Sequence, residues 1–211
     1  MKRILIIDDH AVVRDGLKRM WEENQTATIS FGEASTGPEA VHLAEQQQWD
    51  VAVLDLSLGG TSGLEVLKQL RQIRPKLPVL ILSMHSEEQY ARRAFQAGAA
   101  GYITKDSTRA ELVNAITKVK NGGRYVSPHL AEKLLAYLGK NTKDPPHECL
   151  SDREFEVMCL IASGKTLSEI AELLSLSDKT ISTYRARILE KMAMKTNAEL
   201  TYYAIHNKLV V

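Results

Sequence analysis

Cysteine is scarce in this 211-residue chain, which contains only two, Cys149 and Cys159. No CxxC pair and no grouping of cysteine with histidine surrounds either of them. Disulfide-bonded secreted domains and Cys/His metal sites both depend on such groupings. The sequence therefore predicts two unpaired thiols in a reducing compartment.

Long apolar segments are also absent. No apolar run approaches the roughly 20 residues that cross a bilayer. Residues 1–3 lead directly into a short strand-like segment, whereas the core of a signal peptide needs about 7–15 apolar residues. Apolar residues make up 44% of the chain and charged residues 25%, as in ordinary globular proteins. We therefore expect a cytoplasmic protein of one or two domains with no membrane partner.

A strong net charge is likewise missing, since the formal value is only +1. Residues 178–195 depart from this balance, with two acidic side chains against five basic ones: Lys179, Arg185, Arg187, Lys191 and Lys195. A local basic stretch suits a nucleic-acid surface, but it also suits a solvated helix face. On charge alone, the solvated face is the stronger interpretation.

The first 120 or so residues alternate short apolar runs with amphipathic patterns. The runs predict strands, and the patterns predict helices that alternate with them, which favours an α/β fold with a parallel sheet. The expected strands are 3–7, 28–32, 51–54, 78–82 and 101–103, and the expected helices are 11–22, 36–47, 62–73, 87–97 and 108–120.

The character of the sequence changes after Gly122-Gly123. A helix from Pro128 to Leu138, with Ser127 as its N-cap, is followed by a polar segment containing Pro145-Pro146, so residues 123–147 read as a linker. Residues 148–211 show no convincing strand. They contain four capped helical segments, which begin at Ser151, Thr166, Ser177 and Thr196 and end near Ala162, Leu174, Met194 and His206.

Carboxylates follow two of the expected strands. Asp8 and Asp9 come after one apolar run and Asp55 after another, while Ser83 and Lys105 follow two further runs. Parallel strands present their carboxyl ends at one edge of the sheet, where open α/β sheets bind ligands. Three acids that lie so close require a cation, so the cluster predicts a divalent metal. The set suits an aspartate that accepts a phosphoryl group.

The ordered set Asp8-Asp9-His10, Asp55, Ser83 and Lys105 resembles the receiver domain of two-component response regulators over residues 1–122. The resemblance implies that Asp55 is the phosphoacceptor. It implies that Mg²⁺ is held by Asp9, Asp55 and the backbone carbonyl of Ser57, with Asp8 holding a metal-bound water. Lys105 and Ser83 would contact phosphoryl oxygens, and Tyr102 would turn inward as part of the switch. The chain departs from the family at Gly59, where proline is usual.

Three segments within 148–206 resemble the LuxR-type helix-turn-helix of the NarL/FixJ subfamily: residues 150–158, 161–171 and 176–181. A short helix, a tight turn and a longer basic helix can dock in a major groove. The family pattern places Ser182, Thr183 and Ala186 toward the groove. Lys179, Thr180, Arg185 and Arg187 would then hold phosphates, although either arginine could reach a guanine.

These features together predict a flavodoxin-like, doubly wound, five-stranded receiver domain over 1–122, a linker over 123–147 and an all-α helix-turn-helix domain over 148–211. The expected function is a response regulator that is not an enzyme. A sensor histidine kinase would phosphorylate it, Mg²⁺ would be its cofactor, and it would bind promoter DNA as a homodimer. Two alternatives stay open: a receiver that regulates DNA without phosphorylation, and a phosphatase of the haloacid-dehalogenase type. The latter needs a second acid where Ser57 stands.

Overall fold

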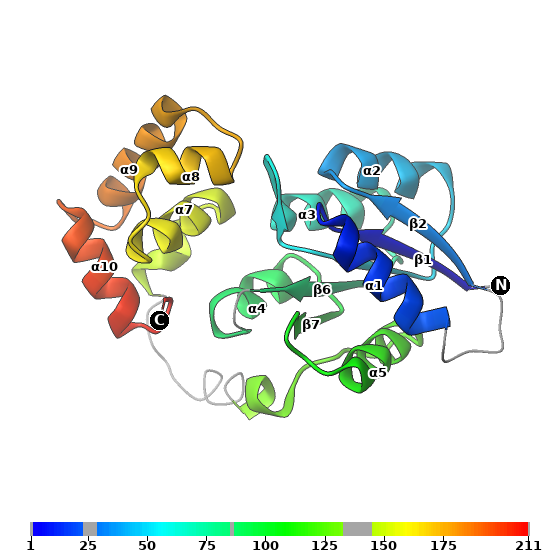
Figure 1. Cartoon of the computed structure of the whole chain (residues 1–211). Helices are drawn as coiled ribbons and strands as arrows, with labels where there is room; N and C mark the ends of the chain where they lie inside the picture. The colour runs from blue at the N-terminus through cyan, green and yellow to red at the C-terminus, as the bar shows by residue number, and fades with distance from the viewer. Residues whose placement is uncertain (1, 23–28, 85–86, 133–144, 211) are drawn as a thin grey trace. The chain divides into compact units, whose positions relative to one another are not determined.

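The computed structural model describes residues 2–22, 29–84, 87–132 and 145–210, which form two compact units (Figure 1). The first unit spans Met1–Lys133 and the second Leu134–Val211. The helix that the sequence predicts from Pro128 does begin at that residue, and the Ser127 hydroxyl accepts a hydrogen bond from the Leu130 amide at 3.1 Å. Its predicted end and residues 133–144 of the predicted linker lie outside the described residues. Among the residues described, no helix is long and apolar enough to span a membrane.

The first unit is built on a five-stranded parallel sheet, as predicted. Its strands are β1 (Lys2–Ile7), β2 (Ile29–Ala34), β3 (Val51–Leu54), β6 (Val79–Ser83) and β7 (Gly101–Thr104). Their order is β2-β1-β3-β6-β7, so the chain reverses its direction of travel across the sheet between β1 and β3. Ligands of doubly wound sheets bind outside the carboxyl ends of the strands at such a reversal.

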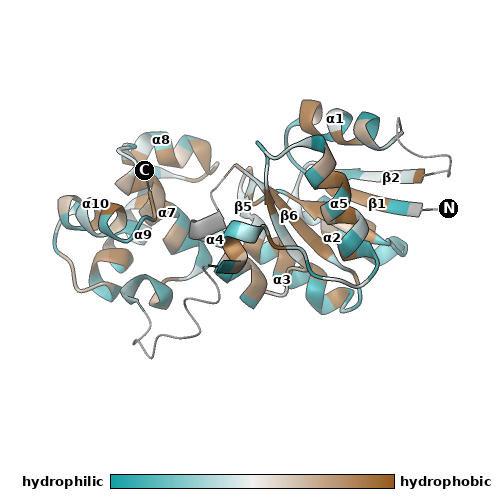
Figure 2. Ribbon diagram, turned by 90° about the horizontal axis from the view of Figure 1, so that it is seen from below, coloured by the Kyte–Doolittle hydropathy of each residue, from teal (hydrophilic) through white to brown (hydrophobic). Residues whose placement is uncertain are grey.

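Five helices cover the two faces of the sheet (Figure 1). They are α1 (Ala11–Glu22), α2 (Gly37–Gln46), α3 (Gly63–Ile73), α4 (Glu87–Gln96) and α5 (Arg109–Lys120). Helix α5 begins in a capping box in which the Thr108 and Glu111 side chains each bond the other's backbone amide. In Figure 2 the residues of strand β6 are coloured as hydrophobic, whereas the surrounding helices contain both hydrophobic and hydrophilic residues, as expected for helices with one buried face.

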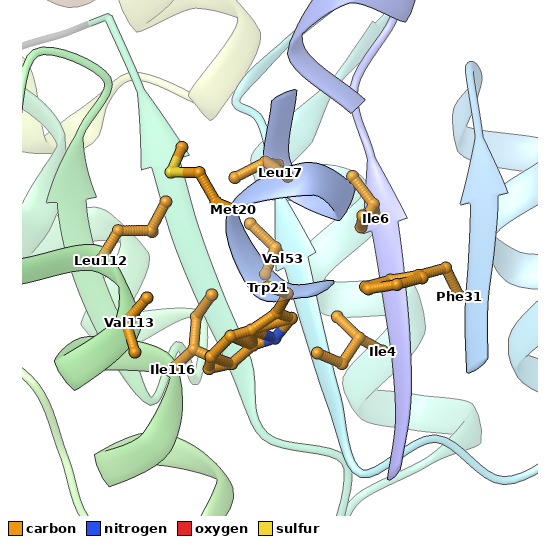
Figure 3. Close-up of a pocket in the computed structure, with 10 residues that line it drawn as sticks. All are labelled: Ile4, Ile6, Leu17, Met20, Trp21, Phe31, Val53, Leu112, Val113 and Ile116. Carbon is orange, nitrogen blue, oxygen red and sulfur yellow. The ribbon is translucent and has the colours of Figure 1, made fainter. Parts of the chain in front are cut away.

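The core beneath α1 and α5 is a continuous apolar cluster. Trp21 of α1 is 6% exposed and packs among sheet and α5 side chains, including Ile4 and Ile116 (Figure 3). The cluster uses alternate residues of each strand, such as Ile4, Ile6, Val51 and Val53, because successive strand side chains point to opposite faces. This packing fixes the strands, and therefore fixes the residues that follow them.

Between β3 and α3 lies a short hairpin, which the sequence did not predict. Strands β4 (Ser57–Leu58) and β5 (Thr61–Ser62) pair antiparallel. The turn between them consists of Gly59 and Gly60, and Gly60 has φ +85°, a value that favours glycine. The hairpin directly follows Asp55 and therefore forms one wall of the predicted site.

The second unit is helical: a 3₁₀ turn (Pro146–Cys149) precedes α7 (Asp152–Ala162), α8 (Leu167–Leu173), α9 (Asp178–Lys191) and α10 (Asn197–His206). The predicted end of α9 at Met194 is wrong. The helix ends at Lys191 because Ala193 adopts φ +54° and the Met194 amide turns back to the Leu189 carbonyl, which caps the helix.

Glu154 joins two of these helices. Its carboxylate accepts from the Ser151 amide and from the Lys191 ammonium, each at 2.7 Å, and its side chain is only 4% exposed. Burial alone raises the pKa of Glu154, but the bonds from Lys191 and Ser151 outweigh it, so the pKa lies below its ordinary value. The pair therefore stabilises the contact between α7 and α9 while Glu154 is ionised.

Candidate functional site

The strand ends bring the predicted receiver residues together at one edge of the sheet. The backbone pairing continues one residue past the strands: the Asp55 amide donates to the Ile7 carbonyl at 2.9 Å, and the Lys105 amide donates to the Ser83 carbonyl at 2.9 Å. These bonds fix the points at which the side chains leave the backbone. Asp8 and Asp55 are both 2% exposed, and Ser83 is fully buried.

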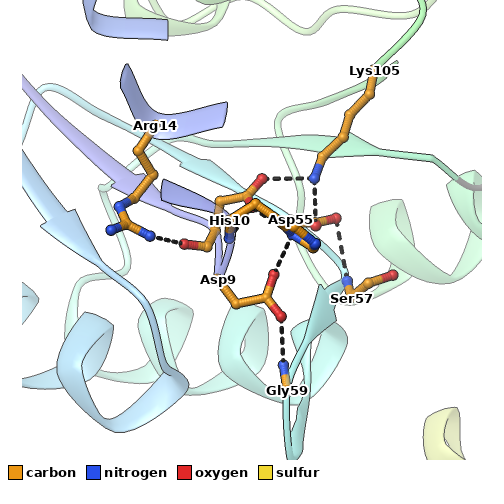
Figure 4. A network of polar contacts seen from close by, with 8 residues as sticks. Asp9, His10, Arg14, Asp55, Ser57, Gly59 and Lys105 are labelled. Atoms are coloured by element: carbon orange, nitrogen blue, oxygen red, sulfur yellow. Dashed lines mark hydrogen bonds and ion pairs between the residues drawn. The ribbon is translucent and has the colours of Figure 1, made fainter. Parts of the chain in front are cut away.

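A single ammonium group holds two of the acids. Lys105 Nζ lies 2.6 Å from Asp55 Oδ2 (Figure 4). The same nitrogen lies 2.7 Å from Asp8 Oδ2. The Lys105 side chain is 12% exposed, so all three charges are largely removed from water. One positive charge between two carboxylates leaves a net negative charge at this edge, to which the nearby Asp9 adds.

The site's charge shows in its pKa values. The pKa of Asp55 is raised, chiefly by burial and further by the Asp8 carboxylate. The hydrogen bond and the charge of Lys105 lower this pKa, but they do not cancel the rise. Burial lowers the pKa of Lys105, but hydrogen bonds to Asp55 and Asp8 more than offset this and raise it. Lys105 therefore stays protonated, and the acids remain short of positive charge.

Backbone amides and one imidazole surround the remaining carboxylate oxygens (Figure 4). The Ser57 amide donates to Asp55 Oδ1 at 3.2 Å, and the Gly59 amide donates to Asp9 Oδ2 at 3.3 Å. His10 Nδ1 lies 2.7 Å from Asp9 Oδ1 and 3.3 Å from Asp8 Oδ1. The β4–β5 hairpin and the start of α1 thus close around the acids from two sides.

The arrangement fits a divalent cation. Asp8, Asp9, His10 and Asp55 each offer a donor atom, and these atoms lie within 4.8 Å of one another. Asp8 Oδ2 is buried and, beyond its ion pair with Lys105, accepts no hydrogen bond from the described residues. Buried carboxylate oxygens with spare acceptor capacity suit Mg²⁺, which prefers oxygen ligands. The part assigned to the Ser57 carbonyl stays a prediction.

The two predicted switch residues lie beside this cluster. Ser83 is the last residue of β6 and pairs in register with Thr104, next to Lys105. Tyr102 occupies β7 and is 0% exposed, so its side chain is inside the protein in this structure. The expected inward movement of Tyr102 on phosphorylation stays a prediction.

Two positioning residues escaped the sequence analysis. Arg14 Nη1 donates to the Asp8 carbonyl at 2.7 Å, while its Nε donates to Glu33 Oε2 at 3.0 Å. Gly63 opens α3, where an added Cβ would lie 2.5 Å from the Asp55 carbonyl oxygen. A glycine at a helix start is a faint signal in sequence, and the contact of Arg14 depends on where β2 lies.

The second unit presents α9 as a partly exposed basic helix. Ile181 and Ile188 are buried against its neighbours, which leaves the opposite side open to solvent. The Ser168 hydroxyl donates to Asp178 Oδ2 at 2.6 Å and so joins α8 to the start of α9. Among the predicted DNA contacts, five side chains are exposed (Lys179, Ser182, Thr183, Ala186 and Arg187) and two are half-buried (Thr180 and Arg185).

Local bonds distinguish these side chains. Arg185 Nε donates to Asn197 Oδ1 at 2.6 Å, which anchors the guanidinium to the first residue of α10. The Thr183 hydroxyl donates to the Lys179 carbonyl at 2.9 Å, so it can offer only its acceptor oxygen to a ligand. Arg185 is thus oriented by the fold rather than free on the surface.

Each of the two units matches a known protein family. Residues 4–117 match the response regulator receiver domain, and residues 148–204 match the bacterial regulatory proteins of the luxR family. Response regulator GacA of Pseudomonas aeruginosa is 35% identical over 211 residues, which cover 100% of this chain and 98% of that protein. Response regulator UvrY of Escherichia coli K12 is 34% identical over 99% of this chain and 96% of its own length.

Solved structures give the same picture of the fold. A two-component response regulator of the LuxR family from Aurantimonas sp. SI85-9A1 is 37% identical, has a TM-score of 0.60, and covers 65% of this chain and 98% of its own. RcsB from Salmonella enterica serovar Typhimurium superimposes with a TM-score of 0.64 over 96% of this chain and 98% of its own. At 23% identity that likeness concerns the fold alone.

Proposed function

Because the chain belongs to the response regulators that join a receiver domain to a LuxR-type DNA-binding domain, we propose that Asp55 accepts a phosphoryl group from a sensor histidine kinase. Membership of that family makes the protein a response regulator transcription factor, and its relatives of this type are not enzymes. The observation that carries the proposal is the buried Asp55 carboxylate, 2.6 Å from Lys105 at the carboxyl edge of the sheet.

The transfer is a displacement at phosphorus. An Asp55 oxygen attacks the phosphohistidine of the kinase, the P–N bond breaks, and its electron pair stays on the imidazole nitrogen. Asp9, Asp55 and the Ser57 carbonyl would hold Mg²⁺, with Asp8 holding a metal-bound water, and the bound ion would offset carboxylate and phosphoryl charge. Lys105 then exchanges its carboxylate partners for a phosphoryl oxygen.

The switch follows from the same residues. We expect the Ser83 hydroxyl, which is buried at the end of β6, to donate to a second phosphoryl oxygen, and Tyr102 to respond to the position of Ser83. In this way a local change of charge at Asp55 would alter the surface of the receiver domain. Lys105 would lose its 2.6 Å contact with Asp55 Oδ2 when the phosphoryl group takes its place, so this ion pair and the phosphorylated state would exclude each other.

The output is binding of promoter DNA by α9 as part of a homodimer. Lys179, Thr180, Arg185 and Arg187 would hold phosphates, while Ser182, Thr183 and Ala186 would face base edges. Burial of Ile181 and Ile188 supports this orientation because it turns the predicted contacts outward. The Mg²⁺ cofactor, the kinase partner, the homodimer, the cytoplasmic location and the domain boundaries at 122 and 148 belong to the same proposal.

The test is phosphorylation of the full chain by a small-molecule phosphodonor with Mg²⁺, followed by a DNA-binding titration. Asp55→Asn should take up no phosphoryl group, because an amide is not the required nucleophile. Asp50→Asn is the matched control, since Asp50 immediately precedes β3 while Asp55 immediately follows it. Labelling of Asp55→Asn at the wild-type stoichiometry would exclude Asp55. DNA binding by a wild-type protein that takes up no phosphoryl group would favour the phosphorylation-independent alternative.

A further inference from the structure

One donor in the acid cluster has no part in the expected Mg²⁺ set. His10 follows the acidic pair directly, and its side chain is 67% exposed, so the ring is open to ions from solution. Its Nδ1 nevertheless faces inward, 2.7 Å from Asp9 Oδ1 and 3.3 Å from Asp8 Oδ1. The ring therefore lies where a cation held by these carboxylates would meet it.

Backbone contacts keep His10 in this place without burying it. Its amide donates to Asp8 Oδ1 at 2.9 Å, and its carbonyl accepts from the Val13 amide at 3.1 Å and the Arg14 amide at 3.3 Å. These last two bonds belong to the first turn of α1 and fix the residue at the start of the helix. The imidazole thus approaches the acids with little freedom in its backbone.

The two distances are those of ion pairs between His10 and the acids, and they also match the spacing of neighbouring ligands of one ion. Two donors at about 2.1 Å from a metal and at right angles to each other lie roughly 3.0 Å apart. The separations of His10 Nδ1 from the two carboxylate oxygens, 2.7 and 3.3 Å, lie on either side of that value. A nitrogen and two oxygens could therefore bind the same ion with small adjustments.

We propose that His10 is a ligand that admits divalent transition metals such as Ni²⁺ to this site in competition with Mg²⁺. The inference rests on the proposed metal site of the receiver domain and adds a nitrogen donor to it. Imidazole suits nickel, copper, iron and zinc, whereas Mg²⁺ prefers oxygen and retains its waters. The contribution of His10 should therefore differ strongly between the two classes of metal.

The experiment is calorimetric titration of the full chain with Mg²⁺ and, separately, with Ni²⁺. In His10→Ala the Kd for Ni²⁺ should rise at least about tenfold, the size of effect typical for metal-site residues, while the Kd for Mg²⁺ stays within about twofold. His10→Gln, which keeps a polar side chain without imidazole, should behave in the same way. His42→Ala is the matched control, because His42 is exposed on α2 and bonds Gln46 of the same helix.

The outcomes separate this inference from the proposed function. Unchanged Ni²⁺ affinity in His10→Ala overturns it, and so does an equal loss for both metals, which would make His10 a positioning residue for the acids. Loss of Ni²⁺ binding confined to the His10 variants supports it, provided that Mg²⁺ displaces Ni²⁺ from the wild type. A wild type that binds Mg²⁺ but shows no Ni²⁺ affinity overturns the inference and leaves the proposed Mg²⁺ cofactor intact, whereas a wild type without Mg²⁺ affinity defeats both.

Discussion

Replacing Lys105 by methionine keeps most of the side-chain volume and removes the ammonium between Asp8 and Asp55. Both carboxylate side chains are at most 3% exposed. Removing one partner of a buried ion pair costs about 3–5 kcal/mol, because the other charge is left buried without compensation. Lys105 is itself 12% exposed, so solvent relieves little of this cost. We expect the free energy of unfolding of the metal-free first unit to fall by about 3 kcal/mol.

The same change should tighten Mg²⁺ binding, because the ammonium and the metal ion compete for the same two carboxylates. If about 1.4 kcal/mol of the penalty is relieved when the ion binds, the Kd for Mg²⁺ falls about tenfold. The deficit in stability should also shrink on acidification. The pKa of Asp55 is already raised, so its folded form binds a proton more readily than its unfolded form, and stability recovers as the pH falls through that pKa.

Urea unfolding of the full chain can report this unit alone. The chain has two tryptophans, Trp21 and Trp49, and both are buried in the first unit, so their fluorescence follows its unfolding. Lys118→Met is the matched control, since Lys118 is an exposed lysine on α5. A loss below about 1 kcal/mol in Lys105→Met, or weaker Mg²⁺ binding, would refute the reasoning, because neither fits an ammonium that compensates buried carboxylates.

Three further changes test the remaining contacts. Gly63→Ala should destabilise the first unit by roughly 1–3 kcal/mol, seen as a lower urea midpoint, because its Cβ would lie 2.5 Å from the Asp55 carbonyl; an unchanged midpoint contradicts this. Glu154→Gln should lower the calorimetric stability of the second unit by about 1 kcal/mol at pH 7. Because the pKa of Glu154 is lowered, the loss should vanish as the pH falls well below 4.5. Arg187→Ala should reduce the salt slope of DNA binding by about one unit and weaken operator and random DNA alike; altered sequence preference would instead indicate a base contact.

The periodicity of apolar residues, together with the turn and capping residues between apolar runs, predicted most of the fold. The five strands and the helices between them were found within one or two residues, because each apolar run lies between clear turn or capping signals, such as Thr108 with Glu111. The gathering of Asp8, Asp55, Ser83 and Lys105 followed from one rule, that parallel strands end at the same edge. That rule needs only the order of the residues along the chain.

The features that the sequence did not reveal depend on contacts between distant segments. The β4–β5 hairpin has two-residue strands, too short for any alternation of apolar and polar residues to show. Arg14 bonds the Asp8 carbonyl and Glu33, a residue of β2, and Arg185 bonds Asn197 across the turn from α9 to α10. Such bonds are decided by tertiary packing, and a single sequence carries no periodic signal for them.

The sharing of Lys105 between two carboxylates bears directly on the proposed switch of the receiver site. Lys105 is shared between Asp8 and Asp55, and neither carboxylate has its full charge compensated. A buried site that is short of positive charge binds a cation readily, and it gains most when the negative charge is then redistributed onto phosphoryl oxygens. Because Lys105 follows β7 directly, the proposed change of partner would act on the strand that carries Tyr102. Under the proposed function, the residue that stabilises Asp8 and Asp55 here would thus also be the one whose release connects phosphorylation to the surface.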